Sequence, residues 1–473
     1  MLPILSIQQM RQWEKATWAT GQTEEHVIQL VGKKLAARIV ELSSSGDAIL
    51  IVAGRGHNGD DARAAIPFMP DRKVFLLNVT DPQRGQVEFL DFIKRCGKQR
   101  PKWIVDALFG IGLSRPLDEH WCKLIETLNG SSTPILAVDV PSGLNVDTGK
   151  TEGAAIRAEL TLTVGAPKTG LLKAPAFTGK VEVISDVGFA ECSIDSELNW
   201  TTPDDFEGLP PRRPVDGNKG TFGHVAIIAG SGGYHGAAVL SARGALRARP
   251  GLVSVYPQAQ AYIPVASQLQ SAMVHVWKGE SHPKNCTAIL FGPGLAGKDV
   301  PDFLKEQVKE LWHNTSLAMI VDASALDWLE SGPTPQNAVR LITPHPGEAG
   351  RMLGSNAKQV QSDRLGALRA LSKKFGDCIV VLKGHQTLVG RSTGKVFVNN
   401  SGNPYLAQGG SGDLLSGYVA GLLAQADWRR NPLLTVRYAV WQHGASADAL
   451  SRVRRNWTIE DLSAHLGEEG VGE

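Results

Sequence analysis

Cysteine is scarce in this chain, and the few cysteines do not form pairs. The sequence of 473 residues contains five cysteines, and none of them stands in a C-x-x-C arrangement. An odd number of scattered cysteines argues against a disulfide framework, and a zinc site would normally show closely spaced pairs. This usage is typical of proteins from a reducing compartment, and we expect a cytoplasmic protein.

Long apolar runs and an excess of charge of either sign are also missing. No stretch is apolar for long enough to span a bilayer, and the N-terminus lacks a basic segment followed by a long apolar run. The formal net charge of +2 gives no general attraction to nucleic acid or to an anionic membrane. We therefore expect neither as a partner. Local backbone groups and a few basic side chains can still hold an anionic small molecule.

The length and composition indicate a globular protein with more than one core. Of the 473 residues, 42% are hydrophobic and 20% are charged, which is a globular composition. A chain of this length usually divides into domains. The segment 200–220 is rich in proline, glycine and charge, as linkers are. We predict two domains, residues 1–200 and residues 210–473.

In the first half, short apolar runs alternate with segments of helix length. These runs end at glycine or aspartate and occupy residues 48–54, 73–79, 103–110 and 134–143. Such runs suit strands that are buried on both faces of a parallel sheet. Because the alternation implies right-handed crossovers, we predict an N-terminal α/β domain with a Rossmann-like, doubly wound sheet.

A second α/β alternation follows in the other half of the chain. Its apolar runs are residues 224–230, 251–257, 287–294, 316–323 and 377–384. It closes with a glycine-rich turn that feeds an apolar segment of helix length. The second half therefore predicts another α/β domain with its own sheet.

The glycine-rich turn, GGSGD at residues 409–413, is the strongest chemical signal in the second half. Glycines let backbone N–H groups approach phosphate oxygens, and the N-terminus of the following helix favours negative charge. The carboxylate of Asp413 could take a proton from a hydroxyl that attacks phosphorus. The alternative is a helix start with an ordinary first-turn aspartate, and the motif alone does not separate the two.

Three further motifs stand where strands of the second half are expected to end. They are TPHPGE at residues 343–348, Lys383 with Gly384, and Gly-Pro-Gly at residues 292–294. Ligands of open α/β sheets collect at the carboxyl ends of strands, and a lysine there can meet a phosphate. Each motif alone could be turn chemistry. Together with GGSGD they indicate one ligand site.

The first half carries a weaker signal, GRGHNGDD at residues 54–61, after its first strand. The third glycine of a dinucleotide fingerprint is missing, so the motif alone is weak evidence. Asp106, Asp139 and Ser142 lie at the expected ends of other strands. Oxygen ligands without thiols or paired histidines suit a hard cation, although asparagine, aspartate and serine are also common in ordinary turns.

The motifs of the second half together resemble the ADP/ATP-dependent NAD(P)H-hydrate dehydratase family, over roughly residues 210–465. In chain order they are KG-x-x-G (219–223), GPGL (292–295), TPHPGE (343–348), KG-x-x-T (383–387) and GGSGD (409–413). The resemblance implies a ribokinase-like fold, Asp413 as catalytic base and ADP or ATP as phosphoryl donor. It also implies Mg²⁺, held through water by Glu348. The implied site residues are Ala237, Gly294 and His345 for the hydrated substrate, and Lys383, Gly384, His385, Gln386, Thr387 and Gly412 for the nucleotide.

The first half is similar to the NAD(P)H-hydrate epimerase family over roughly residues 1–195. The similarity lies in the GRGHNGDD motif, in VDALFG-x-G (105–112), in VD-x-PSG (138–143) and in the lysine of APKTG (166–170). It implies K⁺ held by Asn58, Asp106 and Ser142, and Asp139 as acid/base. The residues implied to cradle the phosphates of hydrated NADH or NADPH are His57, Asn58, Gly59, Asp60, Asp61, Gly110, Ile111, Gly112, Leu113, Ser114, Arg115 and Pro116.

Both halves depart from these patterns in places. His57, Asp60 and Ala62 stand where the epimerase family has asparagine, glycine and glycine. Asp60 adds negative charge beside an expected phosphate site, which predicts weakened binding by the N-terminal half. In the second half, Ser324 stands where the dehydratase family has aspartate.

Three hypotheses follow from the sequence. The first is a bifunctional enzyme that repairs hydrated NADH and NADPH by epimerisation and nucleotide-dependent dehydration. The second is a ribokinase-like small-molecule kinase, which GGSGD alone leaves open. The third makes the first half a non-catalytic binding module, as related folds sometimes are. The resemblance further implies a homo-oligomer.

Overall fold

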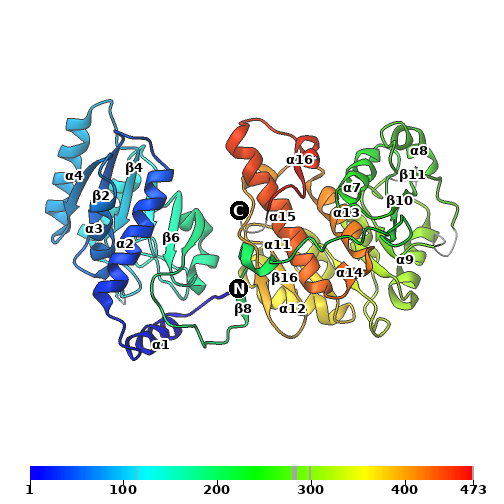
Figure 1. The fold of residues 1–473 in the computed structure, drawn as a ribbon, viewed down its shortest axis with the longest axis horizontal. Coiled ribbons are helices and arrows are strands. Elements are labelled where there is room, and N and C mark those ends of the chain that lie inside the picture. Colours follow the sequence, from blue (N-terminus) through cyan, green and yellow to red (C-terminus); the bar gives the residue numbers. More distant parts are fainter. Residues whose placement is uncertain (114, 280–284, 298–299, 471–473) are drawn as a thin grey trace. The chain divides into compact units, whose positions relative to one another are not determined.

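The structure, a computed structural model, describes residues 1–113, 115–279, 285–297 and 300–470 (Figure 1). The chain forms two compact units, one of residues 2–196 and one of residues 197–473 together with Met1. Each unit has its own sheet, which confirms the predicted pair of α/β folds. No helix in these described ranges combines the length and the hydrophobicity that crossing a bilayer requires.

The N-terminal unit contains a parallel sheet with the strand order β3-β2-β4-β5-β6-β7. Its strands are β2 (Ala48–Ala53), β3 (Lys73–Asn78), β4 (Trp103–Ala107), β5 (Ile135–Val138), β6 (Leu160–Val164) and β7 (Lys180–Ile184). The remaining elements are β1 (Leu2–Pro3), α1 (Ile7–Trp18), α2 (Glu24–Glu41), α3 (His57–Ala65), η1 (Ile66–Phe68), α4 (Pro82–Cys96), α5 (Glu119–Asn129), η2 (Thr169–Lys173) and α6 (Pro175–Thr178).

Both faces of this sheet are buried, as continuous apolar strands require. Along β2, Ile49 and Ile51 pack with residues of α2 and α3, whereas Leu50 and Val52 pack with residues of α4 and α5. The chain adds β3 on one side of β2 and then β4 on the other. The loops that follow β2 and β4 therefore diverge, and a ligand-binding crevice is expected between them.

The C-terminal unit is built on a larger mixed sheet, in which strands are ordered β8-β17-β16-β15-β14-β13-β12-β9-β10-β11. Neighbours are parallel from β11 to β15, and β16 is antiparallel to β15 and β17. The strands are β8 (Leu198–Trp200), β9 (His224–Ile228), β10 (Leu252–Val255), β11 (Met273–Val274), β12 (Ala288–Phe291), β13 (Ala318–Val321), β14 (Arg340–Ile342), β15 (Ile379–Leu382), β16 (Leu388–Gly390) and β17 (Val396–Val398).

Helices pack around this sheet (Figure 1). They are α7 (His235–Arg247), α8 (Ala259–Ala266), α9 (Asp302–Asn314), α10 (Pro346–Met352), α11 (Ala357–Ser362), α12 (Arg364–Lys374), α13 (Ser411–Leu423), α14 (Ala426–Arg429), α15 (Pro432–Val453) and α16 (Ile459–His465). The 3-10 turns of this unit are η3 (Pro203–Phe206), η4 (Ala323–Trp328) and η5 (Pro404–Leu406).

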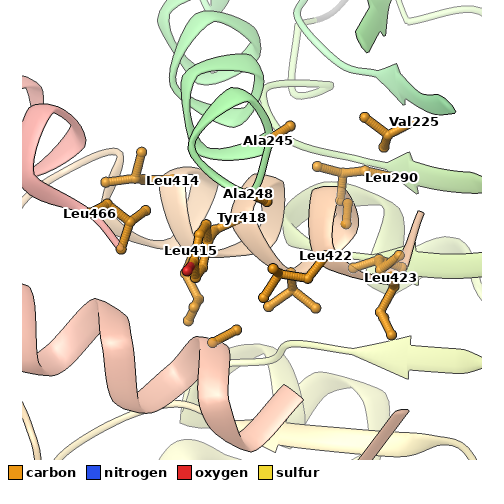
Figure 2. Close-up of a cluster of buried hydrophobic side chains, with 14 of the residues drawn as sticks. Val225, Ala245, Ala248, Leu290, Leu414, Leu415, Tyr418, Leu422, Leu423 and Leu466 are labelled. Atoms are coloured by element: carbon orange, nitrogen blue, oxygen red, sulfur yellow. The ribbon is translucent and has the colours of Figure 1, made fainter. Parts of the chain in front are cut away.

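The helix α13 lies in the middle of the C-terminal core, against α7 (Figure 2). Two glycines allow this approach, because a Cβ atom on Gly417 would lie 1.9 Å from the carbonyl oxygen of Ser241. A Cβ atom on Gly244 would similarly lie 2.1 Å from the oxygen of Leu414. The GGSGD turn at the start of α13 is thus held by a rigid, fully packed helix.

The segment around residue 200 differs from the expected linker. The strand β8 and the turn η3 are parts of the C-terminal unit, whose sheet includes β8. Phe206 is buried in the core of that unit, and Asp205 forms an ion pair with Arg437. Residues 197–206 therefore contribute to the C-terminal fold, because apolar and charged side chains in this polar stretch have partners there.

Candidate active sites

A cavity of about 810 Å³ opens at the carboxyl ends of strands β2 and β4 in the N-terminal unit. Its walls include the loops after these strands, as the strand order leads one to expect. The predicted residues that line it are His57, Asn58, Asp61, Gly110, Ile111, Gly112, Leu113, Arg115 and Asp139. Gly59, Asp60, Asp106, Pro116 and Ser142 do not line it, and Ser114 lies outside the described residues.

Close packing explains two glycines of the GRGHNGDD motif. A Cβ atom on Gly54 would lie 2.1 Å from the carbonyl oxygen of Leu108, and one on Gly59 would lie 2.2 Å from the oxygen of Gly54. The helix α3 begins at His57, with Gly56 as its N-cap, and contains Gly59 in its first turn. The first N–H groups of α3 are therefore available near the cavity to an anionic ligand.

The charge of Asp60 is compensated inside the N-terminal unit. The Arg63 guanidinium donates to the Asp60 carboxylate at 2.8 Å, to the side-chain oxygen of Asn78 at 2.9 Å and to the carbonyl of Gly54 at 2.5 Å. Since the carboxylate is paired and does not line the cavity, the repulsion expected from the sequence is largely offset.

Oxygen atoms gather beside the cavity at the ends of β4 and β5. The side chain of Ser142 donates to Oδ1 of Asp106 at 2.7 Å, and its backbone N–H donates to Oδ2 at 2.8 Å. Asn58 donates through Nδ2 to the carbonyl of Phe109 at 3.0 Å, while its Oδ1 is buried without a hydrogen-bond partner. Burial raises the pKa of Asp106 to about 6, although its bonds from Ser142 oppose the shift. The buried oxygen of Asn58, which has no hydrogen-bond partner, is of the kind that a hard cation binds.

Asp139 is paired with Lys168, a lysine that the sequence motif contained but to which we had assigned no role. The Nζ atom of Lys168 lies 2.5 Å from Oδ1 of Asp139 and also donates to Thr163 Oγ1 and to the carbonyl of Val164. Lys168 is fully buried, and Asp139 adopts a left-handed backbone conformation with φ of 63°. This geometry presents an ion pair to the cavity, whose walls include both residues.

Two more carboxyl groups, Asp61 and Glu14, line the same cavity. Burial raises the pKa of Asp61 well above its usual value, and the charge of Asp139 adds to the shift. Burial also raises the pKa of Glu14, with Lys168 opposing the effect. The cavity thus combines carboxyl groups whose pKa values are raised with a carboxylate held next to an ammonium, an arrangement suited to acid–base chemistry. Glu14 was missed from the sequence because α1 is distant from the motifs.

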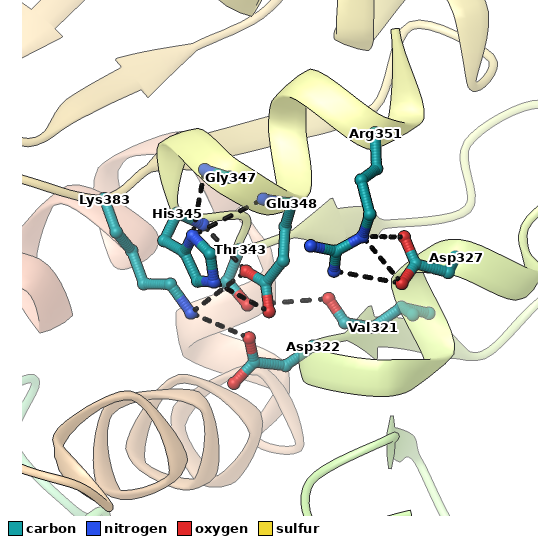
Figure 3. A network of polar contacts seen from close by, with 9 residues as sticks. All are labelled: Val321, Asp322, Asp327, Thr343, His345, Gly347, Glu348, Arg351 and Lys383. Carbon is teal, nitrogen blue, oxygen red and sulfur yellow. Dashed lines mark hydrogen bonds and ion pairs between the residues drawn. The ribbon is translucent and has the colours of Figure 1, made fainter. Parts of the chain in front are cut away.

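In the C-terminal unit, Lys383 lies close to two acidic side chains that come from other segments at the same edge of the sheet (Figure 3). Its Nζ atom lies 2.9 Å from Oδ1 of Asp322 and 4.0 Å from Oε2 of Glu348. Lys383 follows β15, Asp322 follows β13, and Glu348 lies in the first turn of α10. Burial lowers the pKa of Lys383, but the charges of Asp322, Glu348 and Asp413 outweigh this and raise it.

The TPHPGE motif is the N-terminal cap of α10. The ring nitrogen Nδ1 of His345 accepts from the N–H groups of Gly347 and Glu348, at 3.0 and 3.4 Å. The Glu348 carboxylate accepts from the N–H of His345 at 2.8 Å, which completes a capping box (Figure 3). The motif therefore has a structural role, and the His345 side chain, 54% exposed, remains accessible to a ligand.

Asp413 lies in the first turn of α13, after the left-handed residue Gly410 with φ of 93°. Burial raises the pKa of Asp413 to about 7, with contributions from Asp322 and Glu348 and an opposing effect of Lys383. A carboxyl group with a pKa near neutrality is well placed to act as a general base.

The structure brings other predicted residues of the second half together in pairs. A Cβ atom on Gly412 would lie 3.3 Å from Nζ of Lys383, so GGSGD and KG-x-x-T meet. A Cβ atom on Gly294 would lie 2.9 Å from Cβ of Ala237, so the two implied substrate contacts are neighbours. In the loop of residues 383–387, the carbonyl of Gly384 accepts from the hydroxyl of Thr387 at 3.0 Å.

Asp322 and His443 were not predicted as site residues. Asp322 could have been predicted, since it directly follows the buried strand β13. His443 lies in the middle of α15, without any local motif. Burial lowers its pKa to about 4, although a hydrogen bond with the backbone of Ser411 opposes this, so it is neutral behind the GGSGD turn.

The described part of the chain contains no group of three histidine, cysteine, aspartate or glutamate residues that could hold a metal ion by itself. Glu348 already accepts a hydrogen bond from the backbone of His345. Its carboxylate therefore fits a contact with a divalent ion through the ion's bound water. It does not supply a complete set of protein ligands.

Comparison with known proteins shows that each of the two units matches a known protein family. A family model described as NAD(P)H-hydrate dehydratase matches residues 225–469. A second model, described as YjeF-related protein N-terminus, matches residues 73–170. A crystal structure of ADP/ATP-dependent NAD(P)H-hydrate dehydratase from Bacillus subtilis, co-crystallised with ATP and Mg²⁺, is similar with a TM-score of 0.50 and 28% identity, over 56% of this chain and 95% of that chain.

Relatives extend the similarity to nearly the whole chain. The bifunctional NAD(P)H-hydrate repair enzyme of Coxiella burnetii is 31% identical over 97% of this chain and 97% of its own length. The corresponding enzyme of Gloeobacter violaceus is 33% identical over 94% of this chain and 92% of its own length. The chain belongs to the family of bifunctional NAD(P)H-hydrate repair enzymes.

Proposed function

We propose that the C-terminal unit dehydrates the S hydrate of NADH and NADPH and that the N-terminal unit interconverts the R and S hydrates. The observation that carries the proposal is the meeting of Asp413, Gly412 and Lys383 at the start of α13. This arrangement places a base with a raised pKa beside a backbone turn and an ammonium group suited to phosphate. Family membership supplies the substrate.

In the dehydration step, Asp413 takes the proton of the substrate hydroxyl. The oxygen of that hydroxyl attacks the terminal phosphorus of ADP or ATP. The bond between this phosphorus and the nucleotide breaks, and the shortened nucleotide leaves. The C–O bond then breaks with phosphate as leaving group, assisted by the electron pair of the ring nitrogen. Loss of a proton from the neighbouring carbon restores the double bond. Phosphorylation is needed because hydroxide is a poor leaving group.

Residues of three segments would hold the reactants. His345, Gly294 and Ala237 would contact the hydrated nicotinamide, and Gly412 with residues 383–387 would contact the nucleotide. Glu348 would hold Mg²⁺ through water, and the ion would neutralise phosphate charge during transfer. Lys383 stabilises charge that develops on the transferred group, because it is fixed in place by Asp322.

In the N-terminal unit, Asp139 serves as acid/base for the epimerisation, with Lys168 fixing its position. Asn58, Asp106 and Ser142 would hold K⁺, a role supported by the unpaired oxygen of Asn58. Backbone groups of residues 57–61 and 110–116 would hold the dinucleotide phosphates. The ion pair of Asp139 and Lys168 in a large cavity speaks against a purely non-catalytic module. We also propose a homo-oligomer, which light scattering of the purified chain tests.

The test is recovery of absorbance at the reduced-nicotinamide band from mixed R and S hydrates. Wild type with Mg²⁺, K⁺ and ADP or ATP should recover both epimers, faster than they interconvert spontaneously. Asp413→Ala should recover neither. Asp139→Ala should show a fast phase of about half the signal and then slow drift, if epimerisation depends on this residue. No recovery by the wild type with either nucleotide would contradict the proposal and favour a small-molecule kinase.

A further inference from the structure

A partly buried arginine, Arg364, donates hydrogen bonds to the loop of residues 383–387, which we call the nucleotide loop. It is the first residue of α12 and donates three hydrogen bonds to main-chain carbonyls. Its Nη1 atom donates to the oxygens of His385 at 2.6 Å and Gln386 at 3.1 Å, and its Nη2 atom donates to that of Leu382 at 3.1 Å. Burial lowers the pKa of Arg364 to about 10, so the guanidinium remains charged at neutral pH.

The charge of Arg364 has no carboxylate partner within the described ranges, and its Nε atom is buried without a hydrogen bond. A cation that is even partly buried without a counter-ion loses some of its hydration, which costs stability. Arg340 shows that such an arginine can be purely structural, because it binds carbonyls of Trp312 and Thr315 around the end of α9. The difference is that the carbonyls bound by Arg364 belong to the ligand loop.

Carbonyl groups of the loop accept hydrogen bonds from other protein groups, whereas several of its N–H groups donate none within the described residues. The oxygen of Gly384 accepts from the Thr387 hydroxyl, and that of Thr387 accepts from the N–H of Asn399 at 2.9 Å. Within the described part of the chain, the N–H groups of Gly384, His385 and Gln386 donate to no other group. In a trans peptide the carbonyl and the next N–H point in opposite directions. In the peptide between His385 and Gln386, the carbonyl that Arg364 binds therefore leaves the N–H of Gln386 on the side away from Arg364.

The backbone of the loop needs such external support. Gln386 has a φ of 53° and Gly384 has a φ of 133°. A left-handed conformation costs a residue with a side chain free energy and persists where the surroundings impose it. The bonds from Arg364 to both sides of Gln386 provide that constraint.

We propose that Arg364 is a positioning residue for the nucleotide: its bonds to the carbonyls on both sides of Gln386 fix the backbone of residues 383–387 so that the N–H of Gln386 points toward acceptor atoms of the nucleotide. This inference rests on the proposed nucleotide-binding role of the loop. Arg364 itself does not contact the reacting atoms.

The matched control is Arg369, on the same helix. Arg369 also donates to main-chain carbonyls, those of Arg391 and Gly394, and it pairs with Glu197. None of these groups belongs to the nucleotide loop. Arg369→Met therefore removes a comparable set of bonds from α12 without touching residues 383–387.

The experiment compares full-length wild type, Arg364→Lys, Arg364→Met and Arg369→Met. Steady-state assays give kcat and the KM values for nucleotide and hydrate. We expect both Arg364 variants to raise the nucleotide KM about 10-fold or more, with the hydrate KM unchanged, since several charged hydrogen bonds are lost. Nucleotide should slow hydrogen exchange of the Gln386 amide in wild type and in Arg369→Met, but not in the Arg364 variants.

A wild-type nucleotide KM in Arg364→Lys, or equal losses in Arg369→Met, would overturn the inference. Arg364→Lys decides the question if Arg364→Met does not fold, because it keeps the charge and loses the fork of donors. If wild type itself shows no dependence on nucleotide, the proposed function fails instead, and the two failures are thereby distinguished.

Discussion

Replacing Asp413 by asparagine should abolish dehydration and yet stabilise the C-terminal unit at neutral pH. Burial raises the pKa of Asp413 from 3.8 to about 7, with Asp322 and Glu348 adding to the shift and Lys383 opposing it. A carboxyl group with a higher pKa in the folded than in the unfolded chain costs the folded state free energy when it ionises. Function and stability are therefore in opposition at this residue.

The magnitude follows from the size of the shift. A rise from 3.8 to about 7 is about three units, and each unit corresponds to about 1.36 kcal/mol, so ionisation costs at most about 4 kcal/mol. Below pH 3.8 the group is protonated in both states and the cost is absent. It grows as the pH rises and is complete above about pH 7. Asparagine is neutral at every pH and avoids it.

We expect Asp413→Asn to raise the free energy of unfolding by about 2–4 kcal/mol at about pH 8, and by almost nothing near pH 4. Urea denaturation of the full-length chain across this range measures the difference, and hydrogen exchange of the α13 amides identifies the transition of the C-terminal unit. Asp427→Asn on the surface helix α14 is the control, and it should change stability by less than about 0.5 kcal/mol.

A variant that is no more stable than wild type at about pH 8 would refute this reasoning, because ionisation of the buried Asp413 carboxyl group would then cost the folded state no free energy. The same pKa governs activity. Since the base must be deprotonated, wild-type dehydration should fall as the pH drops below about 7. An activity profile that is flat through this region would mean that Asp413 is not the titrating base.

Three other outcomes follow from the structure. Gly417→Ala places a methyl group against the carbonyl of Ser241, so denaturation should show a loss of about 1–3 kcal/mol, with reduced dehydration because α13 shifts. Lys168→Met leaves Asp139 without its ammonium partner, and hydrate recovery should become biphasic while the fast dehydration phase survives. Asn58→Leu removes the unpaired oxygen, so K⁺ should no longer raise the thermal unfolding temperature, in contrast to wild type.

The sequence predicted the fold well because buried strands have a local signature. The run at residues 48–54 becomes β2 and the run at residues 377–384 becomes β15, each followed by a motif residue at the sheet edge. The beginning of the C-terminal unit was less predictable. Residues 200–206 begin a stretch, 200–220, that is rich in proline, glycine and charge in sequence, but Phe206 and Asp205 find partners far along the chain.

The candidate sites were predictable where a short motif marks the end of a strand or the start of a helix. GGSGD and KG-x-x-T identified Gly412 and Lys383, which the structure brings together. Partners from elsewhere in the chain could not be found in this way. Whether Asp60 repels a phosphate depends on Arg63, and the sequence does not show that their side chains meet.

The charges around Lys383 explain why a cation is part of the proposed dehydration. Three carboxyl groups, those of Asp322, Glu348 and Asp413, influence this one ammonium group. With Asp413 ionised the cluster is negative, and a nucleotide brings further negative charge to it. The raised pKa of Asp413 relieves part of this repulsion before substrate binds. The remainder requires positive charge at the phosphates, so we propose Mg²⁺ beside Glu348, and Lys383 alone does not suffice for the anionic reactants.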